Sequence, residues 1–454
     1  MRLNLLLPVL FFCLVTGSFA EQMPPKPDDA YFAPFNPVAA PSPGKLYLKR
    51  GDRLAICGDS ITEQRKYSRI IEDYLTMCVP QLQITTRQYG WSGEKAPGFL
   101  ARMTNDCLRF QPTIATTCYG MNDFQYRPYQ DDIAQVYTAN QTAIVQAFKA
   151  NGVRVILGSA GSVGRIPRWA PKLDDTLLDL NLSLCRFRNL DIQIAGQEDV
   201  RFADVFWPML TGEFAAQKQY GTNYALNGTD GVHPGWAGHT VMAYAYLKAM
   251  GLEGQIGTFT VNLKRNKMKV SAGHRVVSAK DGVFEMESSR YPFCPCATPP
   301  TVAEYPACTQ TDLSSDQSIL SGMSLVPFNQ DLNRLMLIAR NAQAANYAVT
   351  WGEESKVFTA AQLESGINLA AEFPHNPFTD AFARVDAAVA AKQAFETDEI
   401  KNQFEAQKEH LTRAEIADRT ENAVGAAEVI HDKLAAAVKG AFVPVSYTLK
   451  IEAQ

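Results

Sequence analysis

The sequence predicts an α/β protein in which a three-layer α/β/α domain precedes a β-rich accessory unit and a C-terminal helical hairpin. Three observations carry this prediction. Between residues 46 and 252, short strand-like segments alternate with longer helical segments. After residue 252, alternating apolar and polar residues are separated by Gly and Asp turns. Residues 377–441 are rich in Ala, Glu, Lys and Gln, which favour long helices.

The N-terminus has the pattern of a cleaved secretory signal over residues 1–20. Arg2 precedes the apolar run 5–15, which is followed by the small residues Ser18 and Ala20. A spanning helix needs about 20 apolar residues, so this run is too short for one. We therefore expect a secreted or periplasmic protein without stable membrane insertion. Residues 21–45 are rich in Pro and Ala without apolar periodicity, which indicates a linker or an extended arm on the surface.

The segment 46–252 has the rhythm of parallel strands joined by crossover helices. Such a sheet needs helices on both faces, and its functional site lies outside the carboxyl ends of the strands. We expect strands at residues 53–57, 83–88, 113–118, 153–157 and 201–205, and helices at 66–77, 98–108, 131–150, 177–188 and 236–250.

The rest of the chain divides into two further units. The segment 253–373 is predicted to be β-rich, with strands at 258–269, 275–278 and 283–287 and further strand-like pieces within 325–351. The segment 374–454 is predicted to form long helices with a charged outer face, packed as a hairpin on the body, followed by a returning strand at 446–451.

Charge and cysteine content narrow the function classes. The formal net charge is −4, from 43 basic and 47 acidic residues, and no run of Lys and Arg is long enough to follow a phosphate backbone, so we expect no nucleic-acid partner. Removal of the signal leaves an even number of cysteines, which permits disulfides in an exported chain. A loop-closing bridge is expected among Cys294, Cys296 and Cys308, whereas Cys57 and Cys118 are expected to be buried thiols. A zinc site is the alternative interpretation of Cys294, Cys296 and Cys308, but no His lies near these cysteines.

Ser60 is the candidate nucleophile. It follows an apolar strand and Gly58 at the start of a helix, which places its hydroxyl at the carboxyl edge of the sheet. A serine needs a base that removes its proton and a third group that orients the base. Asp230 precedes His233 by three residues, so one turn of loop lets the carboxylate hold the imidazole while its other nitrogen faces Ser60. Taken alone, a serine after Gly-Asp at a helix entrance is more often a helix cap than a nucleophile, and the companion residues change this balance.

An oxyanion hole is the remaining requirement of this chemistry. Gly93 follows the second predicted strand and can offer a backbone N–H, and Asn122 follows the third and can offer a side-chain amide. With the backbone N–H of Ser60, they would make the donor set. The simpler interpretations are a plain turn at Gly93 and an Asx cap at Asn122.

These motifs, in this order, resemble those of the SGNH (GDSL) hydrolases: Gly58-Asp59-Ser60-Ile61-Thr62, Gly93, Gly120-Met121-Asn122-Asp123 and Asp230-Gly231-Val232-His233. The resemblance covers about residues 46–252, and Ile61 stands where the family name has Leu. It implies a flavodoxin-like sheet, Ser60 as nucleophile, Asp230 and His233 as its triad partners, and Gly93 and Asn122 as oxyanion donors. The chain after residue 252 is more loosely similar to the accessory region of exported bacterial members.

The predicted reaction is hydrolysis of carboxylic esters through an acyl-serine intermediate, with no metal or cofactor. The resemblance implies small-molecule or polysaccharide ester substrates, with short acyl groups such as acetyl on carbohydrates. A lipase or arylesterase acting on longer acyl or aryl esters remains an alternative, as does a non-catalytic glycan-binding surface protein, and the oligomeric state is left open. Further residues near the motifs have lesser expected roles. Trp91, Phe124, Tyr126 and Trp169 are candidates for the pocket border, His239 for packing, and Asp59 and Asp123 for bracing loops.

Overall fold

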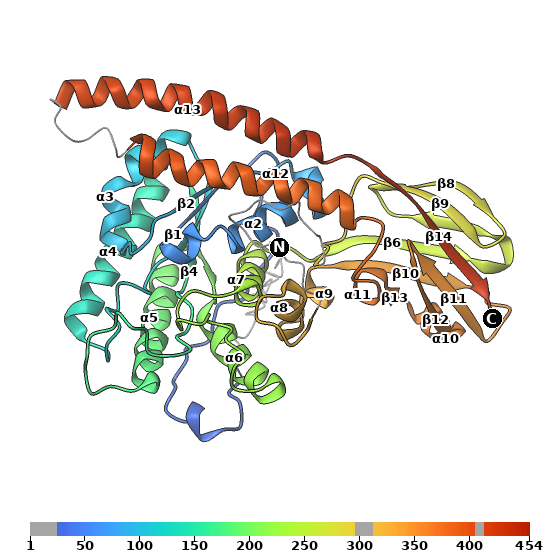
Figure 1. Ribbon diagram of the computed structural model, residues 1–454, viewed down its shortest axis with the longest axis horizontal. Coiled ribbons are helices and arrows are strands. Elements are labelled where there is room, and N and C mark those ends of the chain that lie inside the picture. Colours follow the sequence, from blue (N-terminus) through green and yellow to red (C-terminus); the bar gives the residue numbers. More distant parts are fainter. Residues whose placement is uncertain (1–24, 296–311, 405–412) are drawn as a thin grey trace, which may run out of the picture.

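The computed structural model describes residues 25–295, 312–404 and 413–454. The predicted signal segment 1–20, Cys296 and Cys308 lie outside the described residues, and so does the predicted bridge. Three regions can be followed in Figure 1: a sheet wrapped by helices, a pair of further sheets, and two long C-terminal helices.

The first region is a five-stranded parallel sheet in the order β2-β1-β3-β4-β5. Its strands are almost wholly buried, as expected for a parallel sheet covered on both faces. The predicted α/β/α class is confirmed. The strands are β1 (Arg53–Gly58), β2 (Thr85–Gly90), β3 (Ile114–Cys118), β4 (Arg154–Gly158) and β5 (Arg201–Ala203).

The helices of this region form two layers on opposite faces of the sheet (Figure 1). One layer contains α3 (Ala96–Asp106), α4 (Asp131–Ala150) and α5 (Leu177–Glu198). The other contains α2 (Tyr67–Asp73) and α7 (Trp236–Ala249). A further helix, α6 (Phe206–Tyr220), packs against α5 and α7 where the sequence had predicted none. Pro208 and Gly212 disfavour a helix in this part of the sequence, so the helix was not predicted. Pro208, however, lies in the first turn of α6, where proline is tolerated.

The N-terminal arm lies on α6 through aromatic side chains. Phe32 and Phe35 are buried, and each ring centroid lies 6.2 Å from that of Trp207. The Trp207 Nε1–H donates to the Pro25 carbonyl at 3.3 Å. The arm therefore contributes to the core around α6.

The accessory region contains two sheets, ordered β13-β10-β6-β7 and β12-β11-β14-β9-β8. The predicted strand 258–269 is in fact a hairpin, because a turn ending at Asn266 (φ +46°) separates β6 from β7. Most pairings are antiparallel, but β10 runs parallel to β6. The strands are β6 (Gln255–Asn262), β7 (Lys267–Val270), β8 (His274–Lys280), β9 (Val283–Ser288), β10 (Arg334–Arg340), β11 (Asn346–Trp351), β12 (Glu354–Thr359), β13 (Ile367–Asn368) and β14 (Val445–Ala453).

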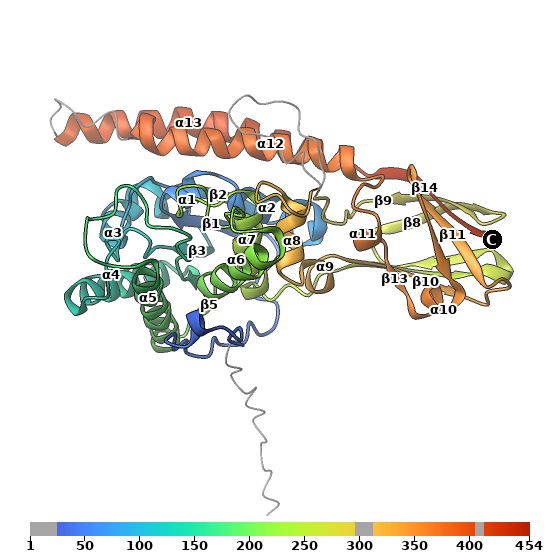
Figure 2. The ribbon, with the colours of Figure 1, turned by 60° about the horizontal axis from the view of Figure 1, so that its bottom comes forward.

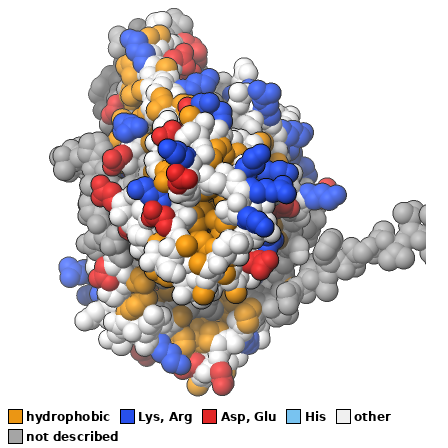
Figure 3. Space-filling model, turned by 90° about the vertical axis from the view of Figure 1, so that its right-hand side faces the viewer, with side chains coloured by type: hydrophobic (Ala, Val, Ile, Leu, Met, Phe, Trp, Pro, Cys, Tyr) orange, Lys and Arg blue, Asp and Glu red, His pale blue; other side chains and the backbone are white. Residues whose placement is uncertain are grey.

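The exposed end of the accessory region carries many cations. In Figure 3, Lys and Arg side chains gather toward one side of this end, beside hydrophobic side chains. The edge strands β7 and β8 expose Lys267, Lys269, Arg275 and Lys280. Charged side chains on edge strands discourage pairing with another sheet, so these residues protect the two edges.

The C-terminal helices α12 (Thr379–Asp398) and α13 (Arg413–Ala441) pack against each other and run alongside the parallel sheet (Figure 2). Side chains of α12 bond to the backbone of the edge strand β2. Lys392 Nζ donates to the Thr86 carbonyl at 2.9 Å, and the Gln88 N–H donates to Glu396 Oε2 at 3.1 Å. The hairpin thus covers an open sheet edge. The chain then returns through β14, which lies between β11 and β9.

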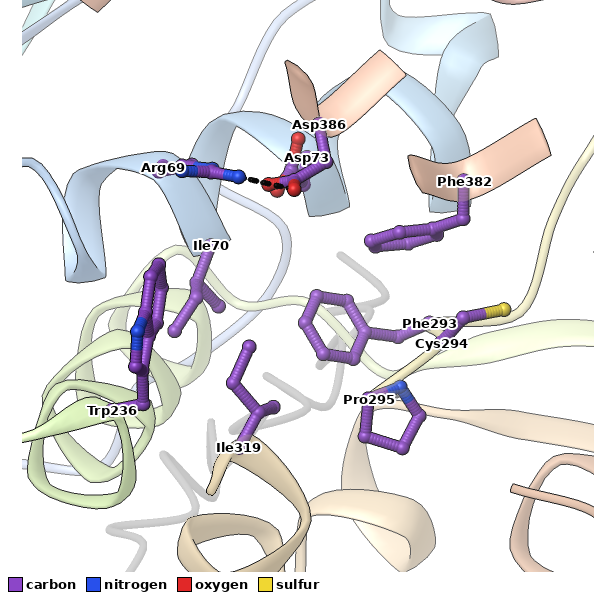
Figure 4. Close-up of a pocket in the computed structure, with 10 residues that line it drawn as sticks. All are labelled: Arg69, Ile70, Asp73, Trp236, Phe293, Cys294, Pro295, Ile319, Phe382 and Asp386. Atoms are coloured by element: carbon purple, nitrogen blue, oxygen red, sulfur yellow. Dashed lines mark hydrogen bonds and ion pairs between the residues drawn. The ribbon is translucent and has the colours of Figure 1, made fainter. Parts of the chain in front are cut away.

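A small cavity lies where the three regions meet (Figure 4). Arg69 of α2 forms an ion pair with Asp386 of α12, and Asp73 lies beside that pair. Burial raises the pKa of Asp73 well above its usual value, and the negative charge of the neighbouring Asp386 raises it further. Phe293 and Trp236 border the same cavity, so residues from all three regions share one core. The limits assigned to the units from the sequence, at 45, 252 and 373, remain predictions.

Candidate active site

Ser60 lies at the carboxyl end of the central strand β1. It is the first residue of the short helix α1 (Ser60–Glu63), and Asp59 caps that helix by accepting the Ile61 N–H at 2.9 Å. The Asp59 carboxyl is buried, and this burial, together with Asp123 and Glu94 nearby, raises its pKa to about 7. The structure therefore assigns Asp59 a bracing position and leaves the Ser60 hydroxyl at the sheet edge.

The structure brings Ser60, His233 and Asp230 into one hydrogen-bonded chain. Ser60 Oγ lies 2.8 Å from His233 Nε2, and His233 Nδ1 lies 2.7 Å from Asp230 Oδ2. In the tautomer that suits both contacts, Nδ1–H donates to the carboxylate and the serine hydroxyl donates to Nε2. The His233 and Asp230 side chains retain 26% and 37% exposure, so the chain opens to solvent at one end.

The loop Asp230–His233 is held by its own backbone. The N–H groups of Val232 and His233 both donate to Asp230 Oδ1 at 2.9 Å. Gly231 between them has φ +87°, a backbone conformation that favours glycine. Partial burial alone would raise the pKa of Asp230, but the two N–H bonds and then the His233 ring lower it below its usual value. The orienting carboxylate is thereby kept ionised.

The two predicted oxyanion donors follow the strands on either side of β1. Gly58 at the end of β1 pairs with Gly90 of β2 and with Cys118 of β3, so the turns carrying Gly93 and Asn122 leave the sheet at the same edge as Ser60. The Gly93 N–H has no protein acceptor within the described part of the chain. The sheet topology therefore puts the two turns at the same sheet edge as Ser60, and the roles of Gly93 and Asn122 as oxyanion donors remain predictions.

The amide of Asn122 is fixed by two contacts. Its Nδ2 donates to the Glu94 carbonyl at 3.0 Å, and its Oδ1 accepts the Tyr126 hydroxyl at 3.1 Å. The first bond uses one of the two Nδ2 hydrogens and leaves the second for a ligand. The same bond ties the loop that contains Gly93 to the loop that contains Asn122.

Asp123 braces both loops from below. Its carboxylate accepts the N–H of Ala96 and the N–H of Gly120, each at 2.9 Å. Burial raises the pKa of Asp123 to about 6. Its contacts are structural, in agreement with the bracing role expected from the sequence.

The remaining sequence candidates divide between core and surface. His239 is fully buried, accepts the Tyr67 N–H at Nδ1 and contacts Gln64 Oε1 at 2.6 Å, so it packs inside the domain. Phe124 is buried as well. Trp169 is 48% exposed, and its ring centroid lies 5.7 Å from that of His233 and 6.0 Å from that of Tyr126. Trp169 therefore stands at the rim of the site.

Three residues that lie at the site were not predicted from the sequence. Glu63 accepts hydrogen bonds from Ser92, and Lys401 of the C-terminal hairpin donates to Glu63. Glu63 and Ser92 lie within three residues of predicted site residues, so their polarity was an available signal. Nothing in the sequence around Lys401 connects it to this site.

Neither a metal-binding cluster nor a membrane-spanning helix is found among the described residues. Across residues 25–295, 312–404 and 413–454, no group of three or more His, Cys, Asp or Glu side chains is placed to hold a metal ion. No helix in these same ranges is long and apolar enough to cross a membrane.

The parallel sheet and the hydrogen-bonded serine, histidine and aspartate have the form of a serine hydrolase. Residues 56–241 match the model of the GDSL-like lipase/acylhydrolase family. The chain therefore carries a domain of this family of ester hydrolases, as the motifs predicted, with an additional C-terminal region. No curated protein sequence matches the chain.

Solved structures resemble the chain at low sequence identity. A gut microbial diltiazem-metabolizing enzyme is 21% identical with a TM-score of 0.70, and the match covers 91% of this chain and 100% of that one. This likeness shows a shared fold that extends well beyond the hydrolase domain. The acetylxylan esterase Axe2 from Geobacillus stearothermophilus is 22% identical with a TM-score of 0.38, covering 46% of this chain and 98% of its own. A putative GDSL-like lipase from Parabacteroides merdae is 22% identical with a TM-score of 0.37, covering 46% and 99%.

Proposed function

We propose that the protein is an exported serine esterase that removes short acyl groups, such as acetyl, from carbohydrates. The observation that carries the esterase assignment is the chain of contacts from Ser60 through His233 to Asp230, at 2.8 and 2.7 Å. The family of the domain supports it independently. The choice of acetyl groups and carbohydrates is supported by the resemblance of the motifs to exported members of the family.

In the proposed mechanism, Ser60 Oγ attacks the ester carbonyl while His233 Nε2 takes the hydroxyl proton. The ionised Asp230 orients His233 and stabilises the imidazolium that forms. The N–H groups of Ser60 and Gly93 and the Asn122 amide donate to the oxyanion. His233 then gives its proton to the leaving alcohol oxygen, and a water molecule repeats the sequence on the acyl-serine to release the acid.

The position of Trp169 favours ester substrates whose alcohol portion has a flat apolar face. Its ring is exposed beside His233, on the side of the site where the leaving alcohol receives its proton. An indole face at this place can stack on the C–H face of a pyranose or on an aromatic ring. The same feature favours an arylesterase as the second candidate, because an aryl alcohol would stack equally well.

The enzyme assignment is tested with 4-nitrophenyl acetate. We expect turnover by the wild type, full activity in the control Ser355→Ala, which changes an exposed serine of β12, and background rates in Ser60→Ala. Equal, background-level rates in the wild type and in Ser60→Ala would contradict the assignment and favour a non-catalytic glycan-binding protein.

The substrate assignment needs a second measurement, in which acetate release from acetylated xylan is compared with hydrolysis of nitrophenyl butyrate and of longer nitrophenyl esters. We expect release from the glycan and rates that fall with chain length. Turnover of long chains without release from the glycan would identify a lipase instead.

Export is proposed from the N-terminal pattern alone. The measurement is the mass of the protein recovered from outside the cytoplasm of an expressing bacterium. We expect a chain shortened by the first 20 residues. A full-length chain confined to the cytoplasm would contradict this proposal and leave the esterase assignment untouched.

A further inference from the structure

We propose that Lys401 of the C-terminal hairpin is a positioning residue for the oxyanion loop, by which we mean residues 91–95 with the donor Gly93. Lys401 acts on this loop through Glu63 and Ser92. This inference rests on the proposed esterase function, since it concerns the donor Gly93. Through Lys401, the C-terminal hairpin would contribute to the geometry of the active site.

Glu63 is the link between the nucleophile and the oxyanion loop. It is the last residue of α1, the helix that begins at Ser60. Its Oε2 accepts the Ser92 hydroxyl at 2.6 Å and also the Ser92 N–H. Because Ser92 directly precedes Gly93, the carboxylate fixes the peptide that presents the Gly93 N–H.

The close packing of α1 on β2 brings Glu63 to this position. A Cβ built on Gly90, the last residue of β2, would lie 2.2 Å from the Glu63 backbone nitrogen. Only glycine permits so close an approach of helix to strand. The Glu63 side chain is thereby held over the start of the oxyanion loop.

Lys401 holds the other oxygen of the same carboxylate. Its Nζ lies 2.7 Å from Glu63 Oε1 and 5.4 Å from the centroid of the Trp91 ring, so it lies close both to Glu63 and to the residue that precedes Ser92. The Lys401 and Glu63 side chains are only 27% and 19% exposed, so solvent screens this pair less than a surface ion pair. Burial alone would raise the pKa of Glu63, but the contacts with Lys401 and Ser92 lower it, which keeps the acceptor ionised.

The backbone that carries Lys401 is anchored independently of this contact. Lys401 lies in the π-helical turn Glu399–Phe404, which follows α12. Glu399 pairs with Arg87 of β2 at 3.1 Å, and Gln88 Nε2 of the same strand donates to Thr397 Oγ1 at 2.5 Å. The turn is therefore fixed relative to the strand from which the oxyanion loop emerges.

Loss of Lys401 should affect the transition state more than substrate binding. Without the ammonium group, the Glu63 carboxylate can turn toward water and release Ser92, which misaligns the Gly93 N–H. An oxyanion donor acts mainly when the charge develops, so kcat should fall while KM changes little.

The test uses the full-length chain and 4-nitrophenyl acetate. For Lys401→Met we expect kcat to fall about 10-fold, KM to change less than about 2-fold and Tm to stay within about 2 °C. Lys401→Arg should restore most of kcat, and Glu63→Gln combined with Lys401→Met should lose little more than either change alone. The control is Glu421→Gln, which removes the ion pair of the hairpin with Arg109 and should leave kcat unchanged.

A second measurement separates this inference from the proposed function. Hydrogen exchange of the peptide containing residues 91–95 should quicken in Lys401→Met and return toward the wild type in Lys401→Arg. This holds whether or not the wild type cleaves the ester, so an inactive wild type would remove the esterase assignment alone. Unchanged exchange in Lys401→Met, or an unchanged kcat in an active enzyme, would overturn the positioning role.

Discussion

The two sides of the candidate active site are held in place by different means. On the acid–base side, Asp230 and His233 lie three residues apart and are bonded to each other and to their own loop backbone. On the oxyanion side, Ser92 is held by Glu63, which is held in turn by Lys401, 338 positions further along the chain. The first side is a local motif, whereas the second requires the hairpin to be folded and docked.

The docking surface of the hairpin explains how a distant segment can be placed so definitely. Lys392 of α12 is buried between Glu72 and Glu396, at 3.2 and 2.5 Å. The Ser68 hydroxyl donates to Gln393 Oε1 at 2.7 Å in the same interface. Buried polar contacts tolerate few alternative alignments, because a shift of α12 would leave charges without partners.

The local side should give the largest effect. In Asp230→Asn, the amide cannot stabilise the imidazolium and favours the wrong tautomer of His233, so we expect kcat to fall on the order of 10³ to 10⁴-fold with the fold retained. Steady-state kinetics with 4-nitrophenyl acetate measure this. Asp132→Asn, an exposed change in the first turn of α4, should keep wild-type kcat. A loss below about 10-fold in Asp230→Asn would mean that the carboxylate does not orient His233.

Breaking the hairpin interface should give the next largest effect, on stability. Lys392→Met leaves Glu72 and Glu396 buried without their cation, which should lower the free energy of unfolding by about 3 to 5 kcal/mol. Chemical denaturation measures the change. Lys356→Met removes an exposed pair with Glu372 at 3.7 Å and should cost less than about 1 kcal/mol. Equal effects of the two substitutions would show that the buried cluster does not hold the hairpin.

Asp59, the buried residue that precedes Ser60, should make the stability of the protein depend on pH. Its folded pKa of about 7 exceeds the value of 3.8 expected without burial, so between these values the unfolded chain releases a proton that the folded protein retains. Its contribution therefore lowers stability as pH rises through this window, and the effect is complete above about pH 7.

Asp59→Asn keeps an oxygen that caps Ile61 and removes this titration. The free energy of unfolding of the variant, relative to the wild type, should rise by roughly 2 to 4 kcal/mol between pH 4 and pH 8. Denaturation curves at both pH values measure it. A constant difference between the two proteins would show that the Asp59 carboxyl ionises normally in the folded state.

Trp169 should give the smallest effect, confined to substrate choice. Trp169→Ala should raise KM about 5-fold for acetylated xylan oligosaccharides, because a stacking surface is lost. It should leave hydrolysis of ethyl acetate, which offers no flat face, within about 2-fold. Val357→Ala, an exposed apolar change on β12, serves as the control. An equal loss on both esters would indicate that Trp169 supports His233 and does not bind the alcohol.

Local patterns in the sequence predicted much of the hydrolase domain and the arrangement around Ser60. The strands are short, β1 and β4 are largely apolar, and Asp230 and His233 are close in sequence, so these features could be seen without knowing the rest of the fold. The helix α6 was not predicted because Pro208 and Gly212 disfavour helices in general. Pro208 is compatible with the helix because it lies in the first turn.

Long-range contacts account for what the sequence did not predict. Lys401 belongs to a polar stretch that looks like any exposed helical face, and only the docking of α12 on β2 brings it to Glu63. The last strand, β14, was expected as a returning strand, but its place between β11 and β9 depends on pairing across the whole accessory region. Spacing along the chain carries no record of such pairings.

Covalent labelling of the serine shows whether His233 activates Ser60 as a nucleophile. After incubation with a fluorophosphonate, intact-mass and peptide spectra should show one adduct per chain, on Ser60, and labelling should be slowed at least about 100-fold in His233→Ala. An adduct on a different serine, or equal labelling rates in the wild type and His233→Ala, would show that Ser60 is not a nucleophile activated by His233.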